Sequence, residues 1–237
     1  MAVGERLFHI LEAQQFSREF LEVELFPHAR TMEGIVERGG TDILKGYSIG
    51  VVFYEPSTRT RVSFERAIRL LGGDYHSTEN AAEFSSVVKG ETIEDTVRIY
   101  QGYYINGLVI RHKEAGSLAR AAAVSKIPII SAGEGTGQHP TQALLDTYTI
   151  QERLGRLDNL RVVMVGDAAH GRTVNSLTYL LAKFIGNEID FVSPEGFGPQ
   201  KGIKDYLKRH GVQFSEGKEL RDAVSNADVV YMTRPQL

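Results

Sequence analysis

Short apolar runs of strand length alternate along this chain with segments of helical periodicity. The predicted strands are residues 47–53, 107–111, 127–132, 160–167, 188–193 and 227–233. The predicted helices lie between them, at residues 57–71, 91–103, 115–125, 140–154, 172–185, 200–210 and 218–226. Alternation of this kind favours parallel sheets with right-handed crossovers and helices on both faces. We therefore predict an α/β fold.

The length of 237 residues suits one large domain or two small ones. The clearest seam is ERLGRLDN at residues 152–159, where a polar helix ends and a new buried strand begins. We therefore expect two doubly wound parallel-sheet domains, residues 1–152 and residues 153–237.

Composition excludes several classes of function. The net charge of −3 provides no global positive field to hold nucleic acid or an anionic membrane. The absence of cysteine excludes disulfides, thiolate catalysis and cysteine zinc sites. The amino terminus carries charges every few residues and lacks the apolar core of a signal peptide or membrane span, so we expect a cytoplasmic protein.

Polar clusters follow the predicted strands. In open parallel sheets, ligands bind beyond the carboxyl ends of the strands, so these clusters are the candidate functional residues. They supply Arg59, Arg61, Arg111, His139, Gln142, Arg172, Arg234 and Gln236.

The stretch FYEPSTRTR, residues 53–61, predicts an anion site. Ser57 is a good N-cap for the helix that follows, and the first amides of a helix point out of its start together with the nearby hydroxyls. Arg59 and Arg61 stand where the helix dipole disfavours cations, and a bound anion would reverse that cost. The alternative is an ordinary N-cap whose arginines are solvated or paired with Glu55 and Glu65. The stretch lacks the glycine-rich loop of a nucleotide-binding P-loop.

The loop GEGTGQHPTQ, residues 133–142, holds His139 just ahead of a helix that starts at Pro140. A histidine near a helix start is biased toward its neutral form, which can donate a hydrogen bond to a carbonyl oxygen. Gln142 lies one turn along, and Arg111 ends another strand. These groups suit a developing oxyanion. The alternative is a histidine that caps its own loop.

Three further cations are weaker candidates on spacing alone. Lys89 lies in a serine-rich loop, where most lysines are only solvated. Arg172 and Arg234 follow separate strands and could each fork onto a carboxylate, which suggests a dicarboxylic substrate. The alternative is that they are surface arginines at domain edges.

Taken together, these motifs resemble the catalytic chain of the aspartate carbamoyltransferase family. The matching stretches are FYEPSTRTRVSFE, SSVVKGE, VIRH, GQHPTQALLD, VGDAAHGRTVNSL and YMTRPQ, in this order and spacing. The ornithine carbamoyltransferase family resembles the chain in STRTR and HPxQ, but it has His-Cys-Leu-Pro where this cysteine-free chain has TRPQ. A dicarboxylic acceptor therefore fits better than a diamino one.

The resemblance implies a role for each matched residue. Ser57, Thr58, Arg59 and Thr60 would bind the phosphate of carbamoyl phosphate. Thr60, Arg111 and His139 would polarise its carbonyl oxygen, and Gln142 would hold its amino group. Arg61 lies beyond the matched contacts, and we expect it to form an ion pair that braces the helix start.

The family also implies how the second substrate and the assembly are arranged. Ser85 and Lys89 would reach into the neighbouring subunit's site in a homotrimer. Lys89, Arg172, Arg234 and Gln236 would bind the carboxylates of L-aspartate. The reaction would yield N-carbamoyl-L-aspartate and phosphate for pyrimidine synthesis, without a metal or other cofactor. Regulatory chains or fusion partners remain possible partners.

The chain departs from the family pattern in a few places. Ala169 and His170 replace a Lys-Tyr pair, Val88 replaces a second lysine, and Pro235 separates Arg234 from Gln236. The family also continues beyond the strand that ends this sequence, so we expect a piece of a longer protein with an incomplete second domain. Two alternatives stay open: a non-catalytic transcarbamoylase-like subunit, and a transcarbamoylase for a different amino acid.

Overall fold

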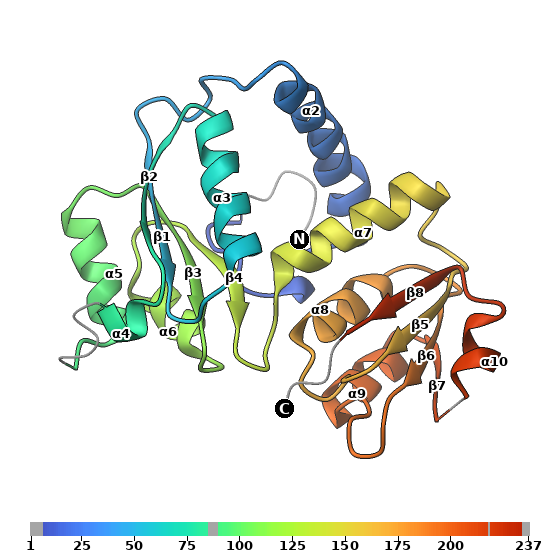
Figure 1. Ribbon diagram of the computed structural model, residues 1–237. Coiled ribbons are helices and arrows are strands. Elements are labelled where there is room, and N and C mark those ends of the chain that lie inside the picture. The colour runs from blue at the N-terminus through green and yellow to red at the C-terminus, as the bar shows by residue number, and fades with distance from the viewer. Residues whose placement is uncertain (1–6, 85–89, 218, 234–237) are drawn as a thin grey trace. The chain divides into compact units, whose positions relative to one another are not determined.

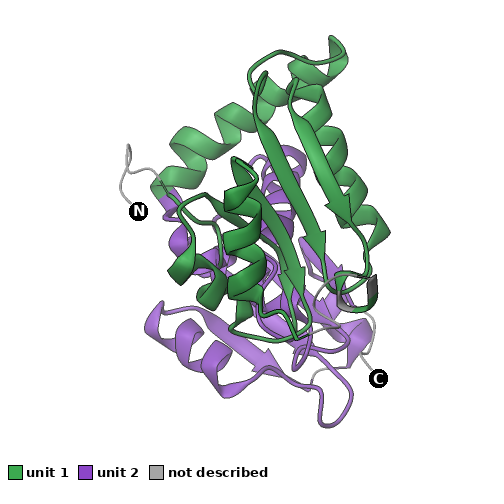
Figure 2. Cartoon of the chain, turned by 90° about the vertical axis from the view of Figure 1, so that its left-hand side faces the viewer, with its two compact units in different colours: residues 1–11, 19–135 green, residues 12–18, 136–237 purple. Residues whose placement is uncertain are grey.

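A computed structural model describes residues 7–84, 90–217 and 219–233. The chain forms two compact units, the first of residues 1–11 and 19–135 and the second of residues 12–18 and 136–237 (Figure 2). Each unit contains one four-stranded sheet in which all described pairings are parallel. The predicted α/β fold with two parallel sheets is confirmed. The predicted boundary between residues 152 and 153 stays a prediction.

The sheet of the first unit has the strand order β2-β1-β3-β4. Its strands are β1 (Ser48–Phe53), β2 (Asp74–Thr78), β3 (Gly107–His112) and β4 (Ile129–Glu134). Its helices include α3 (Thr58–Leu70), α4 (Ala81–Phe84), α5 (Ile93–Gly102) and α6 (Ser117–Val124), and the chain before β1 adds α1 (Arg18–Phe20), η2 (Leu21–Leu25) and α2 (Phe26–Glu37) (Figure 1).

Strand β1 shows why this sheet is covered on both faces. Successive side chains of a strand point to opposite faces, and both sets are buried here. Val51 and Phe53 pack in a cluster with Ile68 of α3. Val52 and Tyr54 pack in a second cluster, which contains buried residues of α5 and α6. The strand therefore reads as a continuous apolar run, which is what predicted it.

The sheet of the second unit has the order β7-β6-β5-β8. Its strands are β5 (Arg161–Val165), β6 (Glu188–Val192), β7 (Gln213–Glu216) and β8 (Val229–Met232). Its helices are η1 (Ala13–Gln15), α7 (Pro140–Leu154), α8 (Arg172–Leu181), α9 (Lys201–Arg209) and α10 (Leu220–Val224). Helices α8 and α9 pack together, and α10 packs on β5 and β6 (Figure 1).

Residues 12–18 belong to the second unit because polar contacts tie them to it. Arg18 makes a bidentate ion pair with Asp158, with nitrogen–oxygen distances of 2.8 and 2.7 Å. The Ala13 amide donates to Gln138 Oε1, and Lys183 Nζ donates to the carbonyl of Gln14. A short amino-terminal segment thus completes a unit formed mainly by the carboxyl-terminal half.

The sequence analysis missed two strands and the amino-terminal helices. β2 reads DYHST and β7 reads QFSE, and both are short edge strands. Neither strand contains a buried side chain, so neither shows the apolar run that marked the other strands, including the edge strands β4 and β8. Helix α2 has only Phe26 and Ile35 buried, among charged and polar residues, so its helical periodicity is weak in the sequence.

Candidate active site

Helix α3 begins where the sequence predicted. Ser57 is its N-cap residue, with an extended backbone at φ −160° and ψ 94°. The Ser57 hydroxyl makes no capping hydrogen bond within the part of the chain that the structure describes. The first amides of an α-helix have no acceptor inside the helix. The helix start therefore offers amides and the hydroxyls of Ser57, Thr58 and Thr60 to a ligand.

Arg111 lies at the same edge of this sheet. Its position in β3 pairs with Phe53 of β1, and its carbonyl accepts a hydrogen bond of 2.8 Å from the Tyr54 amide. Its side chain is 9% exposed. Nη1 donates to the carbonyl of Ala132 at 3.3 Å, and Nε lies 3.3 Å from Glu55 Oε2. The structure thus brings a buried guanidinium to the strand ends that precede the helix start.

Arg61 forms the brace that the sequence predicted. Its guanidinium pairs with Glu65 at 2.6 Å and with Glu79 at 2.9 Å. The sequence alternative, in which the arginines of residues 53–61 pair with Glu55 and Glu65, is therefore correct for the Arg61–Glu65 pair. The hydrogen bond to Glu65 is the main cause of a raised pKa of Arg61. Because the guanidinium already pairs with two carboxylates of the protein, Arg61 is not a candidate ligand for the anion.

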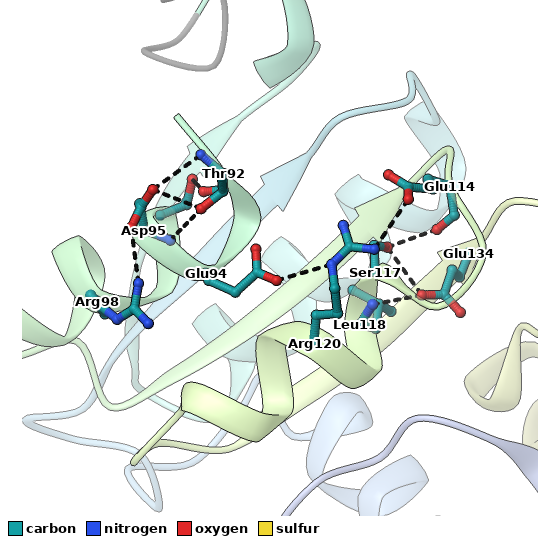
Figure 3. Close-up of polar contacts among 10 residues, drawn as sticks. Thr92, Glu94, Asp95, Arg98, Glu114, Ser117, Leu118, Arg120 and Glu134 are labelled. Atoms are coloured by element: carbon teal, nitrogen blue, oxygen red, sulfur yellow. Dashed lines mark hydrogen bonds and ion pairs between the residues drawn. The ribbon is translucent and has the colours of Figure 1, made fainter. Parts of the chain in front are cut away.

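The strand end before the His139 loop is held by Glu134, the last residue of β4 (Figure 3). Its Oε1 accepts hydrogen bonds from the Leu118 amide at 2.6 Å and the Ser117 hydroxyl at 3.0 Å. A carboxylate at a helix start satisfies amides that the helix leaves unpaired. Arg120 then joins α6 to α5 through Glu94. The carboxyl end of β4 is therefore tied to the start of α6.

In the second unit, His139 is the N-cap residue of α7 and Pro140 is the first residue of that helix, as predicted. The His139 side chain is buried, and its backbone amide donates to the Ser176 hydroxyl of α8 at 2.8 Å. Its Nδ1 lies 3.5 Å from the Thr141 hydroxyl. Helices α7 and α8 are thus joined at the point where this imidazole stands.

Gln142 makes its hydrogen bond along α7. Its Nε2 donates to Asp146 Oδ1 at 2.9 Å, and the Tyr231 hydroxyl of β8 donates to Asp146 Oδ2 at 2.9 Å. Burial raises the pKa of the Asp146 carboxyl, and these two bonds act against that rise. Burial also raises the pKa of Tyr231, and the Asp146 charge adds to that rise. The neutral phenol is therefore the donor.

Arg172 is the first residue of α8, directly after a tight turn. The turn is organised by Asp167, which is fully buried and accepts from the amides of Ala169 and His170 at 3.1 and 2.9 Å. His170 Nδ1 also lies 3.2 Å from this carboxylate. The Ala169–His170 departure from the family pattern is thus accommodated around a buried acid.

The predicted residues that the structure describes are divided between the two units. Ser57, Thr58, Arg59, Thr60 and Arg111 lie in the first unit, and His139, Gln142 and Arg172 lie in the second. Ser85, Lys89, Arg234 and Gln236 fall outside the described residues.

Sequence reasoning missed Asp146 and Tyr231, and it considered Glu55 only as a partner for nearby arginines. Asp146 follows Gln142 by four residues, a spacing that places two side chains on one helix face and that could have signalled the contact. Tyr231 is 85 positions away from Asp146, and no local pattern indicates that pairing.

No group of three or more His, Asp or Glu side chains that could hold a metal ion occurs among residues 7–84, 90–217 and 219–233. Within the same residues, every helix is too short or too polar to cross a membrane.

Two family models match the chain. The carbamoyl-phosphate-binding domain of aspartate/ornithine carbamoyltransferase matches residues 9–152, and the aspartate/ornithine-binding domain matches residues 158–236. The chain belongs to the aspartate/ornithine carbamoyltransferase family. The resemblance inferred from its motifs is confirmed.

Named relatives of this family are similar over nearly the whole chain. The chloroplastic aspartate carbamoyltransferase 1 of Pisum sativum is 52% identical over 99% of this chain and 61% of its own length. The catalytic subunit of aspartate carbamoyltransferase from Methanocella arvoryzae is 43% identical over 96% of this chain and 73% of its own. The chain therefore spans about three fifths of the length of the plant relatives it matches.

Solved structures of the family show the same fold. The catalytic subunit of aspartate transcarbamoylase from M. jannaschii superposes with a TM-score of 0.88 at 41% identity, covering 97% of this chain and 74% of that one. The Trypanosoma cruzi enzyme in complex with carbamoyl phosphate and aspartate superposes with a TM-score of 0.90 at 35% identity, covering 96% and 72%.

Proposed function

We propose that the protein is an aspartate carbamoyltransferase, which transfers the carbamoyl group of carbamoyl phosphate to the amine of L-aspartate. The products are N-carbamoyl-L-aspartate and phosphate, as in the synthesis of pyrimidines. The relatives named for this activity and the relative solved with both substrates support this assignment.

One observation carries the proposal: the start of α3 leaves amides and hydroxyls available to an anion, and the buried Arg111 lies at the carboxyl-terminal end of a strand that pairs with β1, the strand before α3. Ser57 caps no amide of its helix within the described residues, and Arg111 is the penultimate residue of the neighbouring strand β3. Helix-start amides, hydroxyls and Arg59 together suit a phosphate. We assign the phosphate to Ser57, Thr58, Arg59 and Thr60.

The chemistry requires stabilisation of negative charge on one oxygen. The aspartate amine attacks the carbamoyl carbon, a carbon–nitrogen bond forms, and the bond from that carbon to the phosphate oxygen breaks. Thr60, Arg111 and His139 are the proposed donors to the carbonyl oxygen on which charge develops. The departing phosphate takes the proton released by the amine, so no side chain has to act as the base. Gln142 holds the amino group.

The remaining roles concern aspartate and assembly. Arg172, Arg234 and Gln236 are the proposed ligands of the two aspartate carboxylates, with Lys89 and Ser85 supplied by a neighbouring subunit of a homotrimer. Residues 1–152 and 153–237 are the proposed domains for the two substrates. A cytoplasmic location remains a prediction, and the names of the plant relatives are marked chloroplastic.

The full-length natural polypeptide should be tested with carbamoyl phosphate and a mixture of L-aspartate and L-ornithine. We expect carbamoyl-aspartate as the product, measured by mass spectrometry. Carbamoylation of ornithine alone would overturn the aspartate assignment. Binding of carbamoyl phosphate without product from any acceptor would instead identify a non-catalytic subunit.

A further inference from the structure

Asp146 belongs to a hydrogen-bond network that joins α7, β8 and α8 in the second unit. Its Oδ1 accepts from Gln142 Nε2 of α7, and its Oδ2 accepts from the Tyr231 hydroxyl of β8, each at 2.9 Å. The Tyr231 hydroxyl is also hydrogen-bonded to the side chain of Thr173 in the first turn of α8. The Asp146 carboxylate therefore links α7 directly to β8, and through Tyr231 it is connected to the first turn of α8.

The carboxylate gives each bond a single direction. An ionised Asp accepts hydrogen bonds and donates none, so the end of the Gln142 side chain that faces it must be the amide NH₂. The Tyr231 hydroxyl must donate for the same reason, which leaves its oxygen to accept from Thr173. Burial raises the pKa of Asp146, and the bonds from Gln142 and Tyr231 oppose that rise. Each carboxylate oxygen accepts one of these bonds, which is the pattern of an ionised, acceptor-only carboxylate.

The consequence is that Gln142 presents Oε1 to a ligand. None of the residues that the structure describes donates a hydrogen bond to Oε1. A glutamine held by no fixed partner can rotate its amide and present either an acceptor or a donor. Here the orientation is set by charge, because the reverse one would place the carbonyl oxygen of Gln142 against the carboxylate.

We propose that Asp146 is a positioning residue, which fixes the Gln142 amide so that its oxygen receives the N–H group of the carbamoyl substrate. This rests on the proposed function, in which Gln142 holds that amino group. A carbamoyl NH₂ is a donor, so it matches an acceptor and is rejected by a second NH₂. Asp146 is then a specificity determinant, because it favours carbamoyl phosphate over acyl phosphates that carry a methyl group in place of the amine.

The test compares two ligands on one variant. Asp146→Asn keeps the shape of the side chain, but an amide can pair with either orientation of Gln142. Dissociation constants for carbamoyl phosphate and acetyl phosphate are measured by calorimetry on the full-length natural polypeptide. We expect the preference for carbamoyl phosphate to fall about tenfold in the variant, while acetyl phosphate binding changes little. A merely structural role would weaken both ligands equally, and an unchanged ratio would overturn the proposal.

Further variants separate the alternatives. On a Gln142→Ala background, Asp146→Asn is expected to leave the ratio unchanged, and a further fall there would contradict the proposal. Tyr231→Phe keeps the carboxylate but removes one donor, so it should lower the preference by a smaller factor. If Asp146→Asn does not fold, Tyr231→Phe and Asp146→Glu decide the question, the latter with partial recovery of the preference.

The control is Asp205→Asn, which removes the same charge from an exposed position on α9. Its ligand ratio should equal that of the wild type. Failure of the proposed function would give a different result. A wild-type protein that shows no preference for carbamoyl phosphate and forms no carbamoyl-aspartate would overturn both proposals. An active wild type with an unchanged Asp146→Asn ratio overturns only this one.

Discussion

Arg61 ties the first turn of α3 to the end of β2 through Glu79, with Nη2 and Oε2 2.9 Å apart. The same guanidinium bonds through Nη1 to Glu65 Oε1 at 2.6 Å, and that oxygen also accepts from the Ser77 hydroxyl of β2. The helix start and the strand end are therefore joined by a small polar network. The network braces the stretch proposed to bind phosphate without using any of the proposed phosphate ligands.

Arg61→Ala should lower the free energy of unfolding by about 1–2 kcal/mol, because it removes charge-assisted hydrogen bonds from a half-buried site. The measurement is urea unfolding of the 237-residue chain. Arg98→Ala is the matched control, since the side chains of the Arg98–Asp95 pair are 57% and 49% exposed and the substitution should change the free energy of unfolding little. Equal losses for both variants would contradict the bracing role.

Arg111→Lys should lower kcat of the full-length natural polypeptide by a hundredfold to a thousandfold, roughly the cost of removing one preorganised donor to a developing oxyanion. Lysine keeps the charge but loses the fork that reaches both Ala132 and Glu55. The control is Lys113→Ala, an exposed position two residues further along the chain. Steady-state kinetics decide the matter, and an unchanged kcat for Arg111→Lys would remove Arg111 from the proposed mechanism.

Gly171→Ala should disturb the start of α8. An added Cβ would lie 2.3 Å from the carbonyl oxygen of Asp167, and backbone cannot yield as a flexible side chain can. We expect a loss of about 1–3 kcal/mol in unfolding free energy. In the full-length natural polypeptide we also expect a raised KM for aspartate, because Arg172, a proposed aspartate ligand, would be displaced.

The control for this variant is Gly202→Ala in α9. An added Cβ there meets no atom of the described residues within 4 Å, so the change should be neutral or slightly stabilising through helix propensity. If both alanine variants unfold at the same urea concentration, the close approach of Gly171 to Asp167 is not what requires glycine.

Tyr54 should make the protein sensitive to alkaline pH. Burial raises the pKa of Tyr54 to about 12, against the pull of its hydrogen bond to Thr96. The unfolded chain ionises this phenol near its ordinary pKa, about 10, so the contribution is fully present below about pH 10 and is lost as the pH rises toward 12. We expect a loss of about 1 kcal/mol by about pH 11 that Tyr54→Phe does not show.

The experiment is urea unfolding of wild type and Tyr54→Phe between about pH 8 and pH 11, which cancels the titration of other groups in the difference. Tyr103→Phe, at a side chain 72% exposed, should follow the wild-type curve. Parallel curves for wild type and Tyr54→Phe would contradict the assigned shift.

Local chemistry was enough to predict the elements that carry the candidate residues. Buried parallel strands such as β1 and β5 are apolar over most of their length, because both faces are covered, and this makes them visible in the sequence. Two helix starts are marked by backbone preferences that depend on few neighbours. They are Ser57, the N-cap residue of α3, and Pro140, the first residue of α7. The family motifs then supplied the roles.

Only the tertiary structure decided what those residues touch. Strands β2 (DYHST) and β7 (QFSE) are mostly polar and contain no buried side chain, so their own sequences show no strand pattern, and their pairing with β1 and β6 identifies them. The contacts of Arg111 with Ala132, and of Asp146 with Tyr231, join residues 21 and 85 positions apart. Periodicity and capping act over a few residues. The orientation of the Gln142 amide instead depends on the Asp146 carboxylate, which receives its second hydrogen bond from Tyr231 only once β8 has paired with β5. The fold class and the candidate residues could be predicted from local patterns, whereas the orientation of the candidate side chains depends on the packing of distant elements.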